Sequence, residues 1–330
     1  MKIAVFSTKS YDKVYLEKNQ GKHKHTFTYF ETALNADTTN LAIGYEGICI
    51  FVNDKIDKKT IENLSKNGIK LIALRCAGFN NVDLKAAQEK NIKVVRVPAY
   101  SPQAVAEHAV AIILTLNRKT HKVYNRVRES NFSLENLTGF NLYGKTVGVI
   151  GTGQIGVAFC KIMIGFGCKI IAYDIQKSED LISQGIQYQG LNEVLKNSDI
   201  ISLHCPLTPK TTHIFQKSTF SKMKDGVMLI NTSRGALIKT KDAIEALKNR
   251  KIGYLGIDVY EQEEHLFFKD LSESIIQDDL IQRLISFPNV LITPHQGFFT
   301  EEALTQIAVT TIKNISDFEE GKDLPNEVKG

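Results

Sequence analysis

The sequence of 330 residues has no Trp, few Pro and Cys, and no long apolar run. The longest apolar stretch, Ala109 to Leu116, is far shorter than the roughly 20 residues that a transmembrane helix needs, which excludes a membrane-spanning protein. The five Cys are odd in number and lack C-x-x-C spacing. This argues against a disulfide framework and against a zinc site, so we expect no bound metal and a reducing, cytoplasmic location.

The chain also lacks a large excess of positive or negative charge. Lys and Arg total 41 against 36 Asp and Glu, and the cations, 33 of them Lys, are scattered rather than clustered. Without a basic stripe, nucleic acid and membrane surfaces are not expected partners. Apolar residues make up 43% of the chain, which can bury a core, and the length predicts about two domains. The first residues, Met1 to Ser7, are typical of a strand rather than of a signal peptide.

Short apolar runs alternate with longer amphipathic segments along nearly the whole chain, a pattern that predicts an α/β protein with buried parallel strands. Because ten runs exceed what one compact sheet usually holds, we expect two doubly wound sheets. Four runs would form the first sheet: Lys2–Phe6, Gly47–Val52, Ile69–Leu74 and Ile92–Val97. Six would form the second: Thr146–Ile150, Lys169–Tyr173, Asp199–His204, Val227–Asn231, Tyr254–Val259 and Val290–Thr293.

Two helices are expected at the junctions between these groups of strands. Ser101 and Pro102 are typical of a helix start, and a long helix is predicted from Gln103 to about Asn117. The last helix is predicted from Thr300 to about Phe318, from where the chain could return to the first domain.

A glycine motif directly follows the predicted strand Thr146–Ile150. It reads Gly151-Thr152-Gly153-Gln154-Ile155-Gly156, which is G-x-G-x-x-G between a strand and a helix. This motif lets the backbone turn, approach a pyrophosphate and pack the helix on the strand, while the helix N-terminus attracts the phosphates. Asp174 ends the next strand about twenty residues on, where an acid binds ribose hydroxyls and disfavours the extra phosphate of NADP. The sequence therefore predicts an NAD site.

Other polar residues follow the predicted strands at their carboxyl ends, where ligands bind in α/β proteins. Arg234 offers the two parallel hydrogen bonds that a carboxylate accepts, and His295 is of the residue type best suited to act as an acid or base near neutral pH. A carboxylate in the segment Asp258 to Glu263 could hold the His295 ring. The sequence alone does not distinguish Glu261 from Glu263. For His204, packing or a backbone bond beside the cofactor is a better interpretation than catalysis.

Taken together, these motifs resemble the D-isomer-specific 2-hydroxyacid dehydrogenases over essentially the whole chain. The most telling stretches are Arg75–Asp83, Tyr100–His108, Gly151–Gly156, Asn231–Gly235, Asp258–Glu263 and Thr293–Phe299. The resemblance implies a flavodoxin-like substrate domain, residues 1–99 and 299–330, into which a Rossmann NAD-binding domain, residues 100–298, is inserted.

The resemblance also implies site residues and a reaction. The catalytic Arg, Glu and His fall on Arg234, Glu263 and His295. The implied substrate-binding positions are Cys76, Ala77, Gly78, Tyr100 and Phe298. In addition to Gly151 to Gly156 and Asp174, the implied cofactor-binding positions are His204, Cys205, Pro206, Thr211, Thr232, Ser233, Arg234 and Asp258.

Reversible reduction of pyruvate to D-lactate with NADH is the implied activity, in a homo-oligomer of at least two copies. Two alternatives stay open: a relative that acts on a bulkier 2-oxo acid, and an NAD(H)-sensing corepressor-like protein. No further domain follows residue 330 in this sequence, which disfavours the longer phosphoglycerate enzymes.

Overall fold

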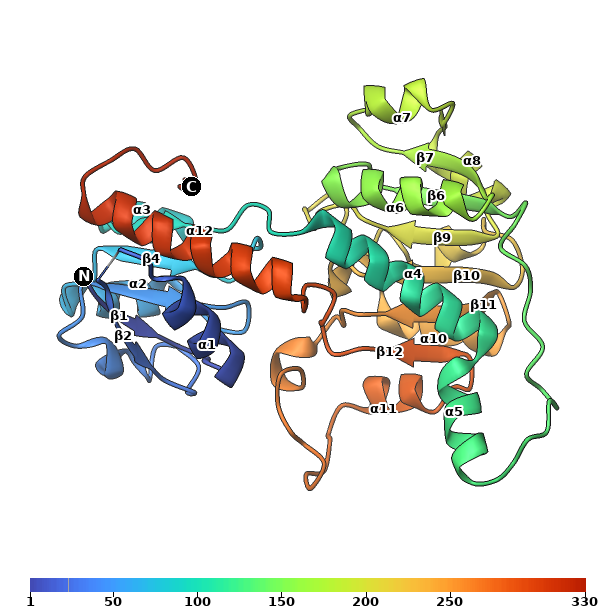
Figure 1. Ribbon diagram of the computed structural model, residues 1–330, viewed down its shortest axis with the longest axis horizontal. Helices are drawn as coiled ribbons and strands as arrows, with labels where there is room; N and C mark the ends of the chain where they lie inside the picture. Colours follow the sequence, from blue (N-terminus) through green and yellow to red (C-terminus); the bar gives the residue numbers. More distant parts are fainter. Residues whose placement is uncertain (23) are drawn as a thin grey trace. The chain divides into compact units, whose positions relative to one another are not determined.

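The computed structural model describes residues 1–22 and 24–330, and it divides into two compact units. Unit 1 consists of Met1–Ser101 and Phe298–Gly330, and unit 2 consists of Pro102–Gly297, so that unit 2 is inserted into the chain of unit 1. Each unit contains one parallel sheet with helices around it (Figure 1). The predicted fold class, two α/β domains with parallel sheets, is confirmed.

Unit 1 has a five-stranded sheet in the order β2-β1-β3-β4-β5, the flavodoxin-like order. All four residues of β3 and of β4 are buried, because helices cover both faces of the sheet. Helices α1 and α12 pack together over one face, where Leu16 and Ile312 meet Val5 and Cys49. The elements of this unit are β1 (Lys2–Val5), α1 (Ser10–Asn19), β2 (Thr26–Tyr29), η1 (Thr39–Ala42), β3 (Gly47–Ile50), α2 (Lys58–Lys66), β4 (Leu71–Leu74), α3 (Leu84–Glu89), β5 (Lys93–Val95) and α12 (Glu301–Glu319).

Unit 2 has a seven-stranded sheet in the order β12-β11-β10-β9-β6-β7-β8. Its strands and short turns are β6 (Thr146–Ile150), β7 (Lys169–Tyr173), β8 (Gln187–Tyr188), β9 (Ile200–Leu203), β10 (Val227–Asn231), β11 (Ile252–Ile257), β12 (Val290–Ile292), η2 (Gly235–Leu237) and η3 (Glu263–His265). Its helices are α4 (Pro102–Arg118), α5 (Thr120–Arg128), α6 (Gln154–Gly165), α7 (Glu179–Ser183), α8 (Leu191–Asn197), α9 (Lys217–Phe220), α10 (Thr240–Lys248) and α11 (Asp279–Ile285).

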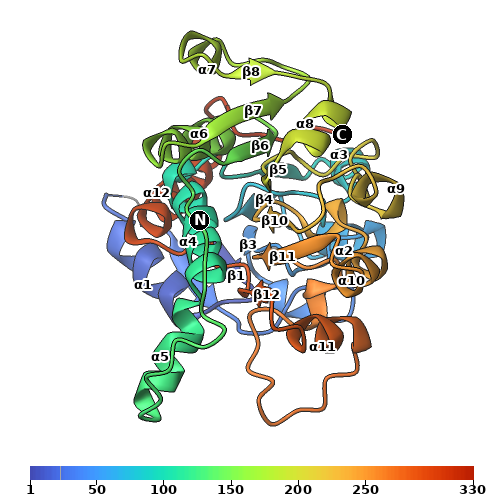
Figure 2. The same cartoon turned by 90° about the vertical axis from the view of Figure 1, so that its right-hand side faces the viewer.

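Strand β10 shows why the sheet of unit 2 is covered on both sides. Its side chains alternate between the two faces. Met228 and Ile230 join the core under α4 and α6, whereas Val227 and Leu229 join the core under α8, α9, α10 and α11. Figure 2 shows α4 and α6 on one side of these strands and α10 on the other.

Two strands were not predicted from the sequence, and both lie at sheet edges. β2 is only half-buried and alternates Thr with aromatic residues, and β8 has two residues. Edge strands need no continuous apolar run because one side lacks a neighbour, so the hydrophobic signal used for the other strands is weak there. The two predicted helices are present, and the Thr300 hydroxyl caps α12 by accepting from the Ala303 N–H.

No helix in the described residues combines the length and apolarity that a bilayer crossing requires. Across the same residues no group of three or more His, Cys, Asp and Glu side chains is arranged to hold a metal ion. The five Cys are free thiols, four of them buried.

Candidate active site

The glycine motif forms the turn between β6 and α6, at the point where the strand order of the sheet reverses. Gly151 has a φ of +95°, and a Cβ atom there would lie 2.5 Å from the Cys205 nitrogen. A Cβ on Gly156 would lie 2.1 Å from the Gly151 carbonyl oxygen, whereas one on Gly153 would meet nothing within 4 Å. The turn is therefore packed against β9 on its inner side and open at the N-terminus of α6, as a dinucleotide phosphate site requires.

Asp174 directly follows β7 and is held in place beside this turn. Its carboxylate accepts hydrogen bonds from the backbone N–H and the hydroxyl of Thr152, and from the Gln176 N–H at 3.0 Å. The Thr152 hydroxyl in turn accepts from the Tyr188 hydroxyl at 2.8 Å. These bonds fix the carboxylate next to the glycine turn.

His204 and Thr232 lie at the ends of β9 and β10, and each has a buried polar atom without a hydrogen-bond partner in the described residues. These atoms are His204 Nδ1 and Thr232 Oγ1. Burial lowers the pKa of His204 to about 3, so that its ring is neutral at pH 7 and cannot act as an imidazolium acid. The ring packs on Phe159 at 4.8 Å and bonds the Ser202 hydroxyl at 2.9 Å. The polar atoms and the open glycine turn fit an NAD molecule along this edge of the sheet.

The loop that carries Arg234 is built by Asn231 at the end of β10. The Asn231 amide accepts from the Ser233 N–H at 3.0 Å and donates to the Arg234 carbonyl at 2.9 Å. The Ser233 hydroxyl donates to the Cys205 carbonyl at 2.6 Å, which joins this loop to the one after β9. The Arg234 guanidinium donates to the Ser233 carbonyl at 2.7 Å, and within the described residues it forms no ion pair with a carboxylate. It is therefore available to an anionic ligand.

His295 and Glu263 form a direct pair in unit 2. Nδ1 of His295 lies 2.8 Å from Oε1 of Glu263, and the two side chains are only 18% and 21% exposed. The second carboxylate oxygen of Glu263 accepts from the Tyr260 N–H at 2.8 Å, which anchors it. His295 has a φ of +57°, an uncommon backbone conformation for a residue other than Gly.

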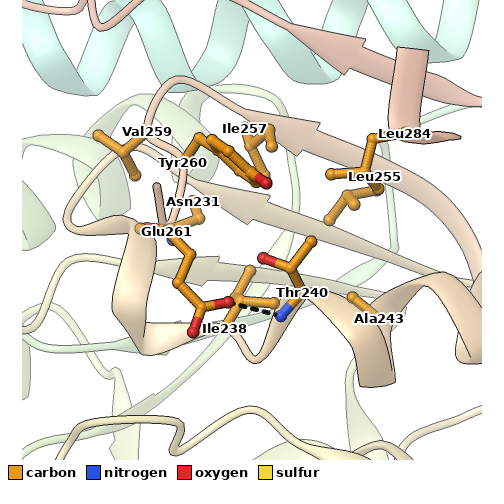
Figure 3. Close-up of a pocket in the computed structure, with 11 residues that line it drawn as sticks. Asn231, Ile238, Thr240, Ala243, Leu255, Ile257, Val259, Tyr260, Glu261 and Leu284 are labelled. Carbon is orange, nitrogen blue, oxygen red and sulfur yellow. Dashed lines mark hydrogen bonds between the residues drawn. The ribbon is translucent and has the colours of Figure 1, made fainter. Parts of the chain in front are cut away.

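Glu261, the other candidate carboxylate, points to a different histidine. Oε1 of Glu261 lies 2.6 Å from Nε2 of His213. Its other oxygen, Oε2, accepts from the Thr240 N–H at 3.0 Å, the bond drawn in Figure 3. Burial opposes ionisation of Glu261, but the Thr240 and His213 hydrogen bonds outweigh it and lower the pKa of this carboxyl. The structure thus assigns one carboxylate to each histidine.

Comparisons with known proteins show the family to which the chain belongs. Residues 110–297 match the family model described as "D-isomer specific 2-hydroxyacid dehydrogenase, NAD binding domain". The chain is 54% identical to "D-lactate dehydrogenase" of Escherichia coli K12, with 99% of this chain and 100% of that protein covered. The chain belongs to the D-isomer specific 2-hydroxyacid dehydrogenase family.

Solved structures of other family members have the same fold. The apo-structure of D-lactate dehydrogenase from Escherichia coli superposes with a TM-score of 0.91 at 52% identity, covering 99% of this chain and 100% of that one. D-lactate dehydrogenase from Aquifex aeolicus, complexed with NAD and lactic acid, superposes with a TM-score of 0.88 at 36% identity, covering 99% of both chains. The residues that match the NAD-binding domain model, 110–297, all lie in unit 2.

Asp258 connects β11 to the loop that presents His295, and sequence reasoning did not foresee its contacts. Its buried carboxylate accepts from the Thr293 hydroxyl, from the Gln296 N–H at 2.9 Å and from the Gly297 N–H at 2.8 Å. His108 of α4 bonds the same carboxylate at 3.2 Å and the Thr293 hydroxyl at 3.0 Å. Burial alone would raise the pKa of Asp258, but the His108 and Thr293 hydrogen bonds lower it on balance.

Sequence reasoning therefore did not identify His108 and Thr293 as residues that bond Asp258 beneath the His295 loop. Both lie within stretches that carry the family resemblance, yet their sequence spacing of 185 residues hides the contact. The available signal for His108 was a polar side chain between apolar residues of the mostly apolar helix Pro102–Arg118.

The predicted substrate residues Cys76, Ala77, Gly78, Tyr100 and Phe298 lie in unit 1. The Cys76–Gly78 turn follows β4 and is held by the Arg96 guanidinium, which donates to the Ala77 carbonyl at 2.8 Å. The rings of Tyr100 and Phe298 lie edge to face with centroids 6.4 Å apart, and Phe51 joins Phe298 at 5.8 Å. In unit 2, Thr211 donates to the Pro206 carbonyl at 2.7 Å, so these two predicted cofactor residues share one loop.

Proposed function

We propose that this protein is a D-lactate dehydrogenase that interconverts pyruvate and D-lactate with NAD as the cofactor. The observation that carries the proposal is the His295–Glu263 pair at 2.8 Å, on an NAD-binding domain that also presents an Arg without a carboxylate partner among the described residues. Relatives named for this activity, such as that of Escherichia coli, support the choice of substrate.

Each proposed catalytic residue has one task. Arg234 binds the pyruvate carboxylate through its planar guanidinium, which matches two carboxylate oxygens. Protonated His295 donates its Nε2 proton to the carbonyl oxygen as that oxygen gains negative charge. Glu263 holds the His295 ring through Nδ1, which leaves Nε2 for the substrate, and its negative charge stabilises the imidazolium.

The cofactor is assigned to the edge of the sheet described above. Gly151, Gly153, Gln154, Ile155 and Gly156 would hold the pyrophosphate, and Asp174 would accept from the ribose hydroxyls. The remaining predicted contacts are His204, Cys205, Pro206, Thr211, Thr232, Ser233, Arg234 and Asp258. When bound, NADH supplies the hydride for C2 of pyruvate.

On the substrate side we propose that the Cys76–Gly78 backbone contributes N–H donors for the carboxylate, and that Tyr100 and Phe298 contact the methyl group. Positioning by these groups raises the rate because the reactants no longer lose orientational freedom at the transition state.

We also propose a cytoplasmic homo-oligomer. Free thiols suit a reducing compartment. Large apolar side chains are exposed close together in sequence, in α5 and in the segment that leads from it to β6, which suits contact with a second copy: Tyr124 (63%), Val127 (45%), Phe132 (73%), Leu134 (81%) and Tyr143 (81%). Light scattering of the purified chain measures its mass, and a monomer would contradict this part of the proposal.

The deciding experiment measures NADH oxidation with a panel of 2-oxo acids, followed by chiral analysis of the product. We expect the highest kcat/KM for pyruvate and a product that is D-lactate. A higher value for a bulkier 2-oxo acid would reassign the substrate. Binding of NADH without turnover of any acid would instead indicate an NAD(H)-sensing protein.

A further inference from the structure

A broad groove lies in unit 2 at the edge of the sheet where the strands begin. Its volume is about 940 Å³, and it is lined by the first residues of β11 and by residues of α4, α5, α10 and α11. The proposed chemistry lies beyond the other end of the strands. Because β11 has six residues and a strand rises about 3.3 Å per residue, about 20 Å separate the groove from Asp258.

The lining of this groove carries charge of one sign. No Asp or Glu occurs among the described residues that line it. Six cationic side chains do, from three segments of the chain: Lys119, Lys122, Arg126, Lys248, Arg250 and Arg283. Such a concentration is unlike the rest of the sequence, where Lys and Arg are scattered among nearly as many acids.

Five of these six cations form no ion pair within residues 1–22 and 24–330, the exception being Lys248, which pairs with Glu245 at 2.7 Å. Three others are steadied by backbone carbonyls instead. Lys119 donates to the Asn136 carbonyl at 2.6 Å, Arg126 to the Glu135 carbonyl at 2.8 Å, and Lys122 to the Pro288 carbonyl. These bonds hold cationic groups together without neutralising them.

Burial and mutual repulsion within the groove lower the pKa of two of its groups. Burial lowers the pKa of Lys122, and the neighbouring charges of Lys119 and Arg126 lower it further. Burial and the Lys122 charge likewise lower the pKa of His121, which also lines the groove. A bound anion would relieve this repulsion, because opposite charge favours the protonated form of each group.

We propose that the groove is a binding site for a small multivalent oxyanion, a ligand with at least two phosphate or carboxylate groups. Its volume is within the range of small-molecule sites, about 300–1,000 Å³. Three of the six cations are Arg, whose forked N–H groups bind two oxygens of such a ligand at once.

The groove and the proposed oligomer surface use different faces of α5. Lys122 and Arg126 are four residues apart and therefore share one helix face. Tyr124 projects about half a turn away from that face, and Val127 about a third of a turn. A second copy that covers the exposed apolar residues can therefore leave the cationic face accessible.

Isothermal titration of the full chain with tripolyphosphate, and separately with citrate, tests the proposal. Saturating NAD⁺ is present so that neither anion is measured at the dinucleotide site. We expect one saturable site per chain, whose affinity falls as salt screens the charges. Binding of tripolyphosphate alone would assign the site to phosphorylated ligands, and binding of citrate alone to polycarboxylates.

The double variant Lys122→Gln/Arg250→Gln removes two groove cations and should raise Kd at least tenfold. The matched control Lys196→Gln/Lys217→Gln removes two exposed cations elsewhere in unit 2 and should leave Kd within about twofold. Equal thermal unfolding midpoints check that both variants fold. Because the readout is binding without turnover, its failure is distinct from failure of the proposed activity, and the groove variant should keep the kcat/KM of the unmodified protein.

Three outcomes would overturn the proposal. The first is that neither anion binds. The second is equal weakening by the two double variants, which would mean attraction by net charge alone. The third is a changed oligomer mass in the groove variant without anion binding by the unmodified protein, which would assign the groove to a second copy.

Discussion

Replacing Glu263 by Gln removes one negative charge from the pair that holds His295 while preserving the size of the side chain. The two oxygens of Glu263 accept from two different groups, His295 Nδ1 at 2.8 Å and the Tyr260 N–H at 2.8 Å. A Gln amide has only one acceptor oxygen, and its NH₂ group can only donate, so it satisfies only one of these N–H groups. The variant loses both the charge that stabilises the imidazolium and the anchor that orients the ring.

The size of the effect follows from the burial of the pair. Because both side chains are about four-fifths buried, water screens the interaction little. A charge-assisted hydrogen bond contributes about 1.5–3 kcal/mol, equivalent to about tenfold to a hundredfold in rate. We therefore expect kcat/KM for pyruvate reduction to fall by that factor in Glu263→Gln, measured by NADH oxidation at fixed pH.

Glu261→Gln is a matched control for this measurement. Glu261 also bridges a histidine and a backbone N–H, through His213 and Thr240, but it does not contact His295. The two variants should lose similar thermal stability, whereas only Glu263→Gln should lose activity. Wild-type efficiency in Glu263→Gln, or an equal loss in both variants, would refute the assignment of Glu263 to the catalytic histidine.

Three further predictions concern binding of the substrate carboxylate, the choice of cofactor and the loop of His295. Arg234→Lys keeps the charge but loses the planar fork, so kcat/KM for pyruvate should fall about tenfold to a hundredfold; unchanged steady-state kinetics would remove Arg234 from the substrate site. In the proposed cofactor site Asp174 would face a ribose hydroxyl of NADH but a phosphate of NADPH, so kcat/KM should favour NADH at least about tenfold, equivalent to about 1.4 kcal/mol, and Asp174→Ala should narrow this difference. Equal use of both cofactors by the unmodified protein would contradict this. Asp258 has a lowered pKa when folded, so its contribution to stability is complete above its ordinary value of 3.8 and is lost as pH falls through the lower folded value. Urea unfolding should therefore give Asp258→Asn a lower free energy of unfolding than the unmodified protein at pH 7, and a smaller decrease of that free energy on acidification. Parallel pH profiles of the two proteins would contradict this prediction.

Features that depend on neighbours in the chain were predictable from the sequence. Buried parallel strands appear as continuous apolar runs, because both faces of the sheet are covered, and these runs predicted β6, β7, β9 and β10 closely. The glycine motif carries its own geometry, since Gly151 needs a positive φ and Gly156 has no room for a side chain. Asp174 was predictable because it directly ends the strand after that motif.

Features that depend on contacts distant in sequence were decided only by the tertiary structure. Glu261 and Glu263 are two residues apart and chemically identical, yet the turn after β11 directs one to His213 and the other to His295. The same holds for the Asp258 carboxylate, whose partners come from α4 and from the loop after β12. The cationic groove joins segments between residues 116 and 289, none of which predicts a binding site by its own sequence. Local sequence determines backbone conformation and burial through nearby sterics and hydrophobicity, whereas the partner of a polar side chain depends on which elements the folded sheet places beside it.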